Sequence, residues 1–395
     1  MNNRQLTEAI RMARFSDIYD DFQYGRLSCE DAAMILGCSP RHFLRLRYRY
    51  DEGGLVSLRD KRVGRVSKKR AGDAEIARIS KLYRERYSDF TVSHFHEFAR
   101  REHGLQRGYT WTRTVLQNAG LVAKTGRGGK HRLRRPRRPM VGMMIHQDAS
   151  KHGWFGDVVC DLVVTMDDAS SEIYSAFFCD EEGTLSSFRG VAQTIEHNGL
   201  FCSFYSDRGS HYWTTREAGG KVDKGNLTQF GRALKQLKIE QIAAYSPQAR
   251  GRSERMFGTL QGRLVNELKL NNINDMADAN RYLQKVYLPV HNARFSIKPE
   301  LEQSAFVPII GLDIKNILCI QEDRIVCSDN TVHYQGKKLQ IPASDYRHHF
   351  VKANVCVHHY ADGCYAVFHG PREIGKYQAD GELQTPERTK NKIAA

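Results

Sequence analysis

The sequence predicts a multidomain protein, with helical units first, an α/β region in the middle and a small β unit near the C-terminal end. Three observations lead to this prediction. Helix-capping residues and apolar residues at helical spacing recur up to about residue 123. Between about 140 and 300, apolar runs of strand length alternate with helical stretches. Short strand-like runs separated by turn residues follow from about 317 to 368.

Residues 28–50 are expected to form two helices joined by a tight turn, within a first domain of residues 1–70. Ser28 and Asp31 form a capping pair for the first helix, Gly37 ends it, and Ser39-Pro40 starts the second. The second helix is expected to turn Phe43, Leu44 and Leu46 inward and Arg41, His42, Arg45 and Arg49 outward. This is the helix-turn-helix pattern, whose second helix enters the major groove of DNA. An ordinary helical hairpin with a solvated basic face is the alternative interpretation.

A second helical unit, winged-helix-like, is expected over residues 71–123. Asp73 begins its first helix, and Thr110 caps a short third helix that Gly120 closes. That third helix presents Arg113 and Gln117, so it is a second candidate for contact with DNA.

Residues 124–139, KTGRGGKHRLRRPRRP, are too rich in glycine, proline and basic residues to form a core and are expected to be a linker. A solvated charge run without a partner is the alternative interpretation. Because the segment joins the candidate DNA-binding units to the next domain, we expect it to follow a phosphate backbone or a minor groove. The candidate contacts in it are Arg132, Arg134, Arg135, Arg137 and Arg138.

The positive charge is concentrated near the N-terminal end. Residues 1–140 contain 31 Lys and Arg against 15 Asp and Glu, whereas the remainder contains 29 against 30. Such asymmetry indicates a polyanionic partner, usually nucleic acid. A basic membrane-surface segment would need an apolar helix face, which the most basic stretch lacks.

The sequence has no signal peptide and no 18-residue apolar run, so we expect no membrane partner and a cytoplasmic protein. The nine cysteines form no C-x-x-C pair, which argues against a zinc ribbon or a thioredoxin-type site. They are expected to be reduced thiols.

The α/β region is expected over residues 140–300, with strands near 141–147, 160–166, 173–178, 201–205 and 239–244 and helices near 184–197, 227–237 and 249–270. Asp148 is expected to end the first strand and Asp207 the fourth, and Glu254 lies near the start of the long helix. Ligands gather outside the carboxyl ends of strands in such sheets. Two carboxylates would therefore converge there if the two strands are neighbours, with the helix bringing a third.

Three carboxylates suit Mg²⁺ or Mn²⁺, and two such ions can activate a hydroxyl nucleophile and stabilise the leaving oxygen of a phosphodiester. Each residue also has an ordinary alternative. An Asp at a strand end is usually a turn residue, and a Glu in the first turn of a helix usually complements the helix dipole. The pair Asp167-Asp168 is a rival source of carboxylates, but a turn is the simpler interpretation for it.

The stretch from Gln147 to Phe295 resembles the catalytic core of bacterial insertion-sequence transposases of the ISNCY type, in the integrase and transposase superfamily. The matching motifs are HQDASKHGWFGD, TMDDASSEIYSAFF, FYSDRGS, AAYSPQARGRSERMFGTLQGRLVNEL and HNARFS. The resemblance implies an RNase H-like fold in which Asp148, Asp207 and Glu254 hold two Mg²⁺ or Mn²⁺ ions per active site. The spacings of 59 and 47 residues suit it. We also expect Arg250 and Arg252 of the SPQARGRSER block to contact DNA.

The resemblance implies a DNA transposase that binds the terminal inverted repeats of its element and catalyses metal-dependent strand cleavage and transfer into target DNA. A DNA-binding regulator with an inactive core and a metal-dependent nuclease without strand transfer are the alternatives. A homodimer or larger assembly on double-stranded DNA is expected, and the resemblance implies a nucleoid-associated bacterial protein. Leu283, Val286, Tyr287 and Leu288 either face a partner or pack on their own core. Residues 310–370 resemble the small β-barrels that follow many such cores, and residues 371–395 are expected to be a flexible tail.

Overall fold

The computed structural model describes residues 3–59, 70–124, 126, 135–156, 158–217, 220–245 and 251–384. The chain divides into two compact units, residues 1–81 and residues 82–395, and the division falls inside one helix, α4 (Asp73–Arg86). Among the described helices, none is both long and apolar enough to cross a membrane. All nine cysteines are free thiols.

The first unit contains three helices, α1 (Asn3–Gln23), α2 (Cys29–Ile35) and α3 (Pro40–Ser57). The predicted caps are confirmed: the Ser28 hydroxyl accepts a hydrogen bond from Asp31 N, and the Ser39 hydroxyl accepts one from His42 N. Phe15, Ala33 and Phe43 lie in the small core that the three helices share. The prediction that Leu44 points inward is wrong, because its side chain is 45% exposed.

The second unit starts within α4 and continues with α5 (Val92–His103) and α6 (Tyr109–Asn118). Asp73 begins α4 as predicted, but the cap of α6 is Gly108 rather than Thr110. Helix α5 ends at Gly104, whose φ of 64° lies in the left-handed region that glycine adopts without strain.

Five strands form a mixed sheet in the order β3-β2-β1-β4-β5. The strand β2 runs antiparallel to β1 and β3, while β4 and β5 run parallel to β1. This mixed sheet agrees with the α/β region expected over residues 140–300. The bounds are β1 (Ile145–Phe155), β2 (Val158–Asp167), β3 (Ile173–Cys179), β4 (Ser203–Ser206) and β5 (Glu240–Ala243).

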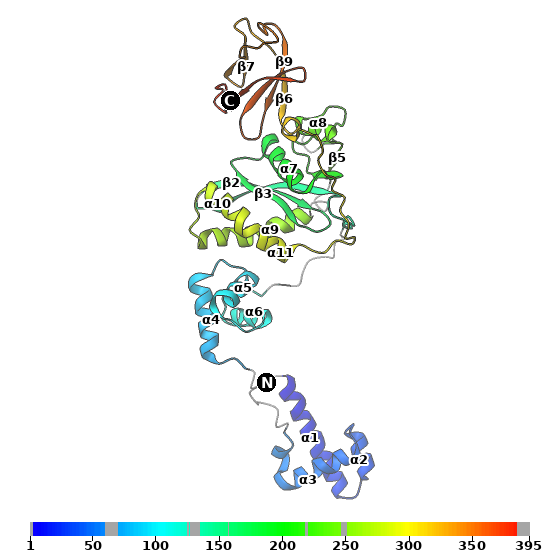
Figure 1. Ribbon diagram of the computed structural model, residues 1–395. Helices are drawn as coiled ribbons and strands as arrows, with labels where there is room; N and C mark the ends of the chain where they lie inside the picture. Colours follow the sequence, from blue (N-terminus) through cyan, green and yellow to red (C-terminus); the bar gives the residue numbers. More distant parts are fainter. Residues whose placement is uncertain are drawn as a thin grey trace, which may run out of the picture. The chain divides into compact units, whose positions relative to one another are not determined.

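Helices cover both faces of this sheet (Figure 1). One core joins the sheet to α7 (Thr184–Asn198) and α8 (Gln229–Gln236). The other joins it to α9 (Gly251–Leu270), α10 (Met276–Tyr282) and the π-helical turn Leu283–Tyr287 that leads into α11 (Leu288–Phe295). Leu283, Tyr287 and Leu288 are buried in this second core, whereas Val286 is 47% exposed. Leu283, Tyr287 and Leu288 therefore pack on the core of their own chain, which is the second of the two interpretations given above.

Helix α5 is joined to α9 by buried polar contacts. Arg263 of α9 donates two hydrogen bonds to the Glu97 carboxylate, at 2.9 and 2.5 Å, and Arg294 pairs with the same carboxylate. His94, which is fully buried, lies 3.0 Å from Glu267. The α5 and α9 helices are thus fixed to each other by groups that are 166 or more residues apart in sequence.

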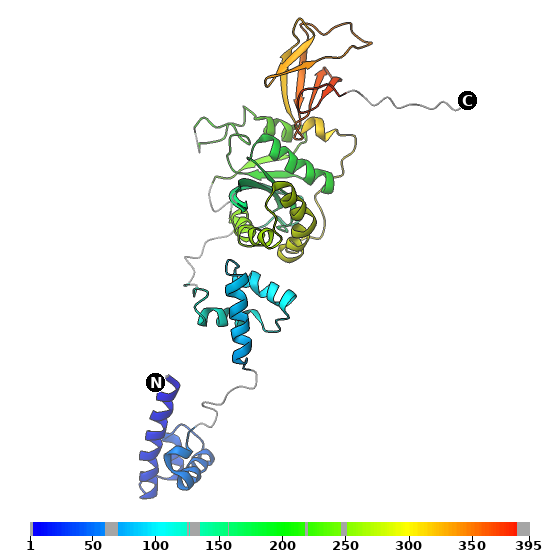
Figure 2. The same cartoon turned by 90° about the vertical axis from the view of Figure 1, so that its left-hand side faces the viewer.

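The C-terminal strands form a β unit of their own, coloured orange to red in Figure 2. A four-stranded sheet has the order β11-β10-β9-β6, and β7 and β8 form a separate hairpin. The predicted closed barrel is not found among the described residues. The hairpin strands are only four residues long and pack their side chains onto the sheet, through Val332 and Leu339, instead of pairing with it. The bounds are α12 (Ile314–Ile317), β6 (Ile320–Ile325), β7 (Thr331–Tyr334), β8 (Lys337–Gln340), β9 (Asn354–His359), β10 (Tyr365–His369) and β11 (Arg372–Tyr377).

Candidate active site

Two of the three predicted carboxylates are brought together by the register of the parallel strands β1 and β4. His146 pairs with Tyr205, and Asp148 and Asp207 each follow these residues by two positions. Asp207 lies just beyond the end of β4, as predicted. Asp148 does not end its strand, because β1 continues to Phe155 as one arm of a hairpin with β2. The two residues nevertheless lie close along the sheet, because β4 ends at Ser206, one residue before Asp207.

Asp148 lies on the face of the sheet that α9 covers. Side chains alternate along a strand. Gln147 points toward α7, where its amide donates to the Ser187 carbonyl at 3.2 Å, and Ser150 points toward α9, where it accepts from Gln261 at 2.9 Å. Asp148 lies two positions before Ser150 and so shares its face. Glu254 lies two helical turns before Gln261, on the same face of α9.

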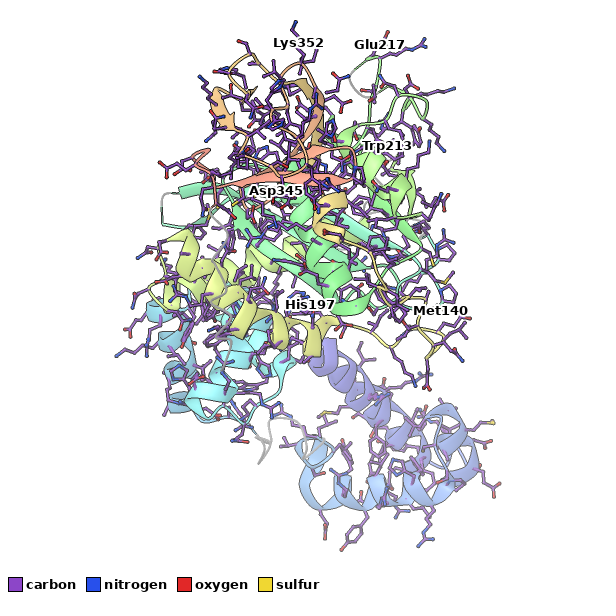
Figure 3. The ribbon with its side chains drawn as sticks, turned by 45° about the horizontal axis from the view of Figure 1, so that its top comes forward. Met140, His197, Trp213, Glu217, Asp345 and Lys352 are labelled. Carbon is purple, nitrogen blue, oxygen red and sulfur yellow. The ribbon has the colours of Figure 1, made fainter. Side chains whose placement is uncertain are left out.

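The loop after β4 is anchored by the Asp207 side chain and by aromatic residues. The Asp207 carboxylate accepts a hydrogen bond from Gly209 N at 2.8 Å, and the Trp213 indole donates to Ser206 Oγ at 3.2 Å. Figure 3 shows Trp213 on this loop. These contacts hold the backbone that carries Asp207 against the end of β4.

A buried polar network lies on the α7 side of the two aspartates. The Tyr212 hydroxyl donates to Gln147 Oε1 at 2.9 Å and accepts from Ser187 Oγ at 3.2 Å. Gln147 Nε2 donates to Thr165 Oγ1 at 2.9 Å. These side chains pack so closely against α7 that a Cβ added at Gly190 would lie 2.2 Å from Gln147 Nε2. The residue beside Asp148 is therefore fixed from three directions.

The electrostatic field around Tyr212 is negative. Burial contributes most to raising the pKa of Tyr212 well above its ordinary value, and the charges of Glu182, Asp148 and Asp207 raise it further. Negative charge and all-oxygen ligands fit a hard divalent cation. Glu254 is exposed, and within the described residues no three His, Cys, Asp or Glu side chains gather closely enough to hold a metal ion.

Sequence reasoning took Asp168 for a turn residue and missed its second role. Its fully buried carboxylate pairs with Arg135 and Arg252 and lies 2.7 Å from His146 Nε2. Burial alone would raise the pKa of Asp168, but the hydrogen bond and charge of His146 and the charge of Arg252 hold it well below its ordinary value. The one available signal was the basic segment before residue 140, which needs a counter-charge. Asp167 does form the predicted turn, by accepting from Ala169 N and Ser170 N.

The predicted DNA contacts of the first unit differ in how free their guanidinium groups are. Arg41 and Arg45 are exposed on α3, and Arg45 lies 2.8 Å from His42 Nδ1. Arg49 instead donates to the carbonyls of Ser57 and Arg59. The accessible basic surface of α3 therefore centres on Arg41, His42 and Arg45.

The predicted contacts nearer the α/β region are mostly engaged within the chain. Arg135 and Arg252 pair with Asp168, and Arg137 donates to the Asp168 carbonyl at 2.7 Å. Arg138 is exposed and contributes only its backbone N–H, which donates to Asp168. On α6, Arg113 and Gln117 are half-buried, and Arg132, Arg134 and Arg250 lie outside the described residues.

Two curated proteins resemble the chain over most of its length, although no known family profile matches it. A protein of Sinorhizobium fredii named "Putative transposase y4bF" is 32% identical over 343 residues, which is 86% of this chain and 74% of that protein. The "Transposase for insertion sequence IS1202" of Streptococcus pneumoniae is 28% identical over 350 residues, covering 79% of this chain and 74% of that one.

Two solved structures show a distant likeness. The simian T-cell lymphotropic virus intasome, solved in complex with the PP2A regulatory subunit B56 gamma, aligns with 71% of this chain and 91% of its own at 13% identity and a TM-score of 0.34. The HTLV-2 integrase catalytic core domain, solved with magnesium in a trimeric form, aligns with 36% of this chain and 85% of its own at 15% identity and a TM-score of 0.28.

Proposed function

The chain belongs to the bacterial insertion-sequence transposases, and we propose that it binds the terminal inverted repeats of its element and cleaves and transfers DNA strands with Asp148, Asp207 and Glu254. The observation that supports this proposal is the parallel register of β1 and β4, in which Asp148 and Asp207 each follow a paired residue by two positions, with Asp148 on the face that α9 crosses. A protein whose function were only to occupy DNA would have no use for two adjacent carboxylates there.

Asp148, Asp207 and Glu254 are the residues that would hold two Mg²⁺ or Mn²⁺ ions. When bound, such ions activate an attacking hydroxyl and stabilise the leaving oxygen of a phosphodiester. The chain contributes rigid positioning. The Asp207 carboxylate is oriented by Gly209 N, and the backbone of Asp148 is held by its neighbour Gln147 in the buried network with Tyr212.

We propose that DNA binding begins with the basic N-terminal part of the chain. The exposed Arg41 and Arg45 on α3 suit a major groove, and Arg138 suits a phosphate. Residues 1–140 carry an excess of positive charge, so two copies repel each other until phosphates neutralise them. The free protein should therefore be monomeric or weakly dimeric at moderate salt, and a dimer or larger complex should form on paired element ends.

The test compares three site variants with a matched carboxylate elsewhere on the sheet. Asp148→Asn, Asp207→Asn and Glu254→Gln should each abolish Mg²⁺-dependent cleavage of element-end DNA and leave the Kd for that DNA within about twofold. Glu240→Gln alters an exposed carboxylate on β5 of the same sheet and should cleave like the unaltered protein. An Asp148→Asn protein that cleaves at the normal rate would refute the assignment.

An integration assay then separates the proposed function from its two alternatives. A transposase cleaves and joins element ends to target DNA. A nuclease cleaves without joining, and a regulator with an inactive core binds the ends but does neither.

A further inference from the structure

Asp168 is a buried anchor for three segments that are distant in sequence. It lies at the turn between β2 and β3, and its backbone N–H donates to Met144 O at 3.0 Å. Its carboxylate accepts from Arg138 N at 2.8 Å and pairs with the guanidinium groups of Arg135 and Arg252. The Arg252 fork also donates to the Arg135 carbonyl at 2.7 Å. The first turn of α9 is thereby tied to the turn and to the segment before the sheet.

The same contacts fix the direction of α9 over β1. The Arg252 end of α9 lies beside Asp168 and His146, and Gln261 lies at Ser150. The nine residues from Arg252 to Gln261 rise about 13 Å along a helix. The four residues from His146 to Ser150 span about 13 Å along a strand. Helix and strand therefore run side by side in the same direction.

Glu254 lies between these two attachment points, and so does Asp148 on the strand. Glu254 is two residues beyond Arg252, and Asp148 is two residues beyond His146. The attachment at Asp168 consequently determines how far along β1 the Glu254 carboxylate lies. The apolar core contacts of α9 begin at Met256 and Phe257, and the Arg252 contact restrains the helix on the other side of Glu254.

We propose that Asp168 and Arg252 are positioning residues for Glu254, and that Arg252 serves the active site in this way rather than by contacting a phosphate. This inference rests on the proposed function, in which Glu254 completes the site. The Arg252 side chain is only 16% exposed and already pairs with a carboxylate, so it has little capacity for a second anion. For Arg252, this positioning role replaces the contact with DNA that the sequence suggested.

The test uses the full chain with Arg252→Ala, Arg252→Lys and Asp168→Asn. Arg281→Ala is the matched control, because it removes an arginine that pairs with Asp278 on the surface of α10. Four quantities are measured: cleavage of element-end DNA against Mg²⁺ concentration, calorimetric binding of Mn²⁺, the salt dependence of DNA affinity, and hydrogen exchange of the amides of Arg255 to Gly258. Circular dichroism confirms that each variant is folded.

Arg252→Ala should lower cleavage at least 10-fold, weaken Mn²⁺ binding several-fold and speed exchange in the first turns of α9, with DNA affinity unchanged. Arg252→Lys should restore only part of the loss, because an ammonium group cannot bridge Asp168 and the Arg135 carbonyl as a planar fork does. Asp168→Asn should behave like Arg252→Ala, and Arg281→Ala like the unaltered protein.

Two results would overturn the proposal. One is an Arg252→Ala protein with normal Mn²⁺ binding and normal exchange. The other is a fall in DNA affinity with the slope of log K against log salt reduced by about one, which marks a lost phosphate contact. If the unaltered protein neither cleaves DNA nor binds Mn²⁺, the proposed function fails instead, and the exchange measurement still tests whether Arg252 holds α9.

Discussion

Gly190 offers a direct test of how tightly the chain packs beneath Asp148. A methyl group at this position of α7 would lie 2.2 Å from Gln147 Nε2 and 2.8 Å from Thr165 Oγ1. These two atoms form a buried hydrogen bond of 2.9 Å. Gly190→Ala must therefore displace the Gln147 side chain, which is only 2% exposed.

The expected magnitude follows from three contributions. Overpacking a core costs about 1–3 kcal/mol. Leaving a buried donor or acceptor without its partner costs about 1–3 kcal/mol. Alanine in place of glycine within a helix returns about 1 kcal/mol. The net loss in the free energy of unfolding is about 3 kcal/mol, which corresponds to a fall in Tm of about 6 °C for a unit of this size.

Gly258→Ala is the matched control, because it makes the same substitution inside α9 where nothing lies within 4 Å of the added methyl group. It should raise Tm by about 2 °C through helix propensity alone. Thermal unfolding of both variants, followed by circular dichroism, measures the difference. A Gly190→Ala protein that melts at or above the temperature of the unaltered protein would show that the network beneath Asp148 can rearrange freely, and the reasoning would be wrong.

Three further predictions concern stability, pH and DNA. Arg263→Met should lower the free energy of unfolding by about 2–3 kcal/mol in urea titrations. The loss is smaller than for a fully buried ion pair because Arg294 still pairs with Glu97. An unchanged urea midpoint would contradict the packing of α5 on α9. Burial lowers the pKa of His291 to about 4, so the unfolded chain binds its proton first and stability falls as pH drops from about 6.5 toward 4. His291→Phe should remove about 2 kcal/mol of the stability difference between pH 7 and pH 5, and an unaltered pH profile would count against it. Arg45→Ala should weaken binding to element-end DNA and Arg281→Ala should not, and gel-shift titrations giving equal Kd values for the two would remove α3 from the DNA interface.

The local signals in the sequence were sufficient where structure depends on neighbours in the chain. The caps at Ser28 and Ser39 and the start of α4 at Asp73 are examples, because side-chain caps act within three residues. The order of strands and helices from β1 to α9 was also predictable from apolar periodicity. The place of Asp207 at the end of β4 followed from the same pattern.

Features that depend on distant partners were not predictable in this way. Asp148 was expected to end the first strand, yet β1 continues to Phe155 because β2 pairs with it along the hairpin. The prediction of a closed barrel failed because the composition of β7 and β8 does not show whether they pair with other strands. Asp168 looked like half of a turn, and only the fold brings Arg135 and Arg252 to it from 33 and 84 residues away.

The joining of α5 to α9 bears on how such proteins can exchange parts in evolution. A recombination that replaces the chain ahead of Asp73 keeps Glu97 with Arg263 and His94 with Glu267, so a new recognition module could be acquired without altering the helix that carries Glu254. A junction placed in the basic segment near residue 124 separates those partners and leaves the buried Arg263 of α9 without Glu97. Chimeras made at the two junctions should therefore differ in solubility. Domain exchange in evolution should have favoured the junction ahead of Asp73 over the junction near residue 124.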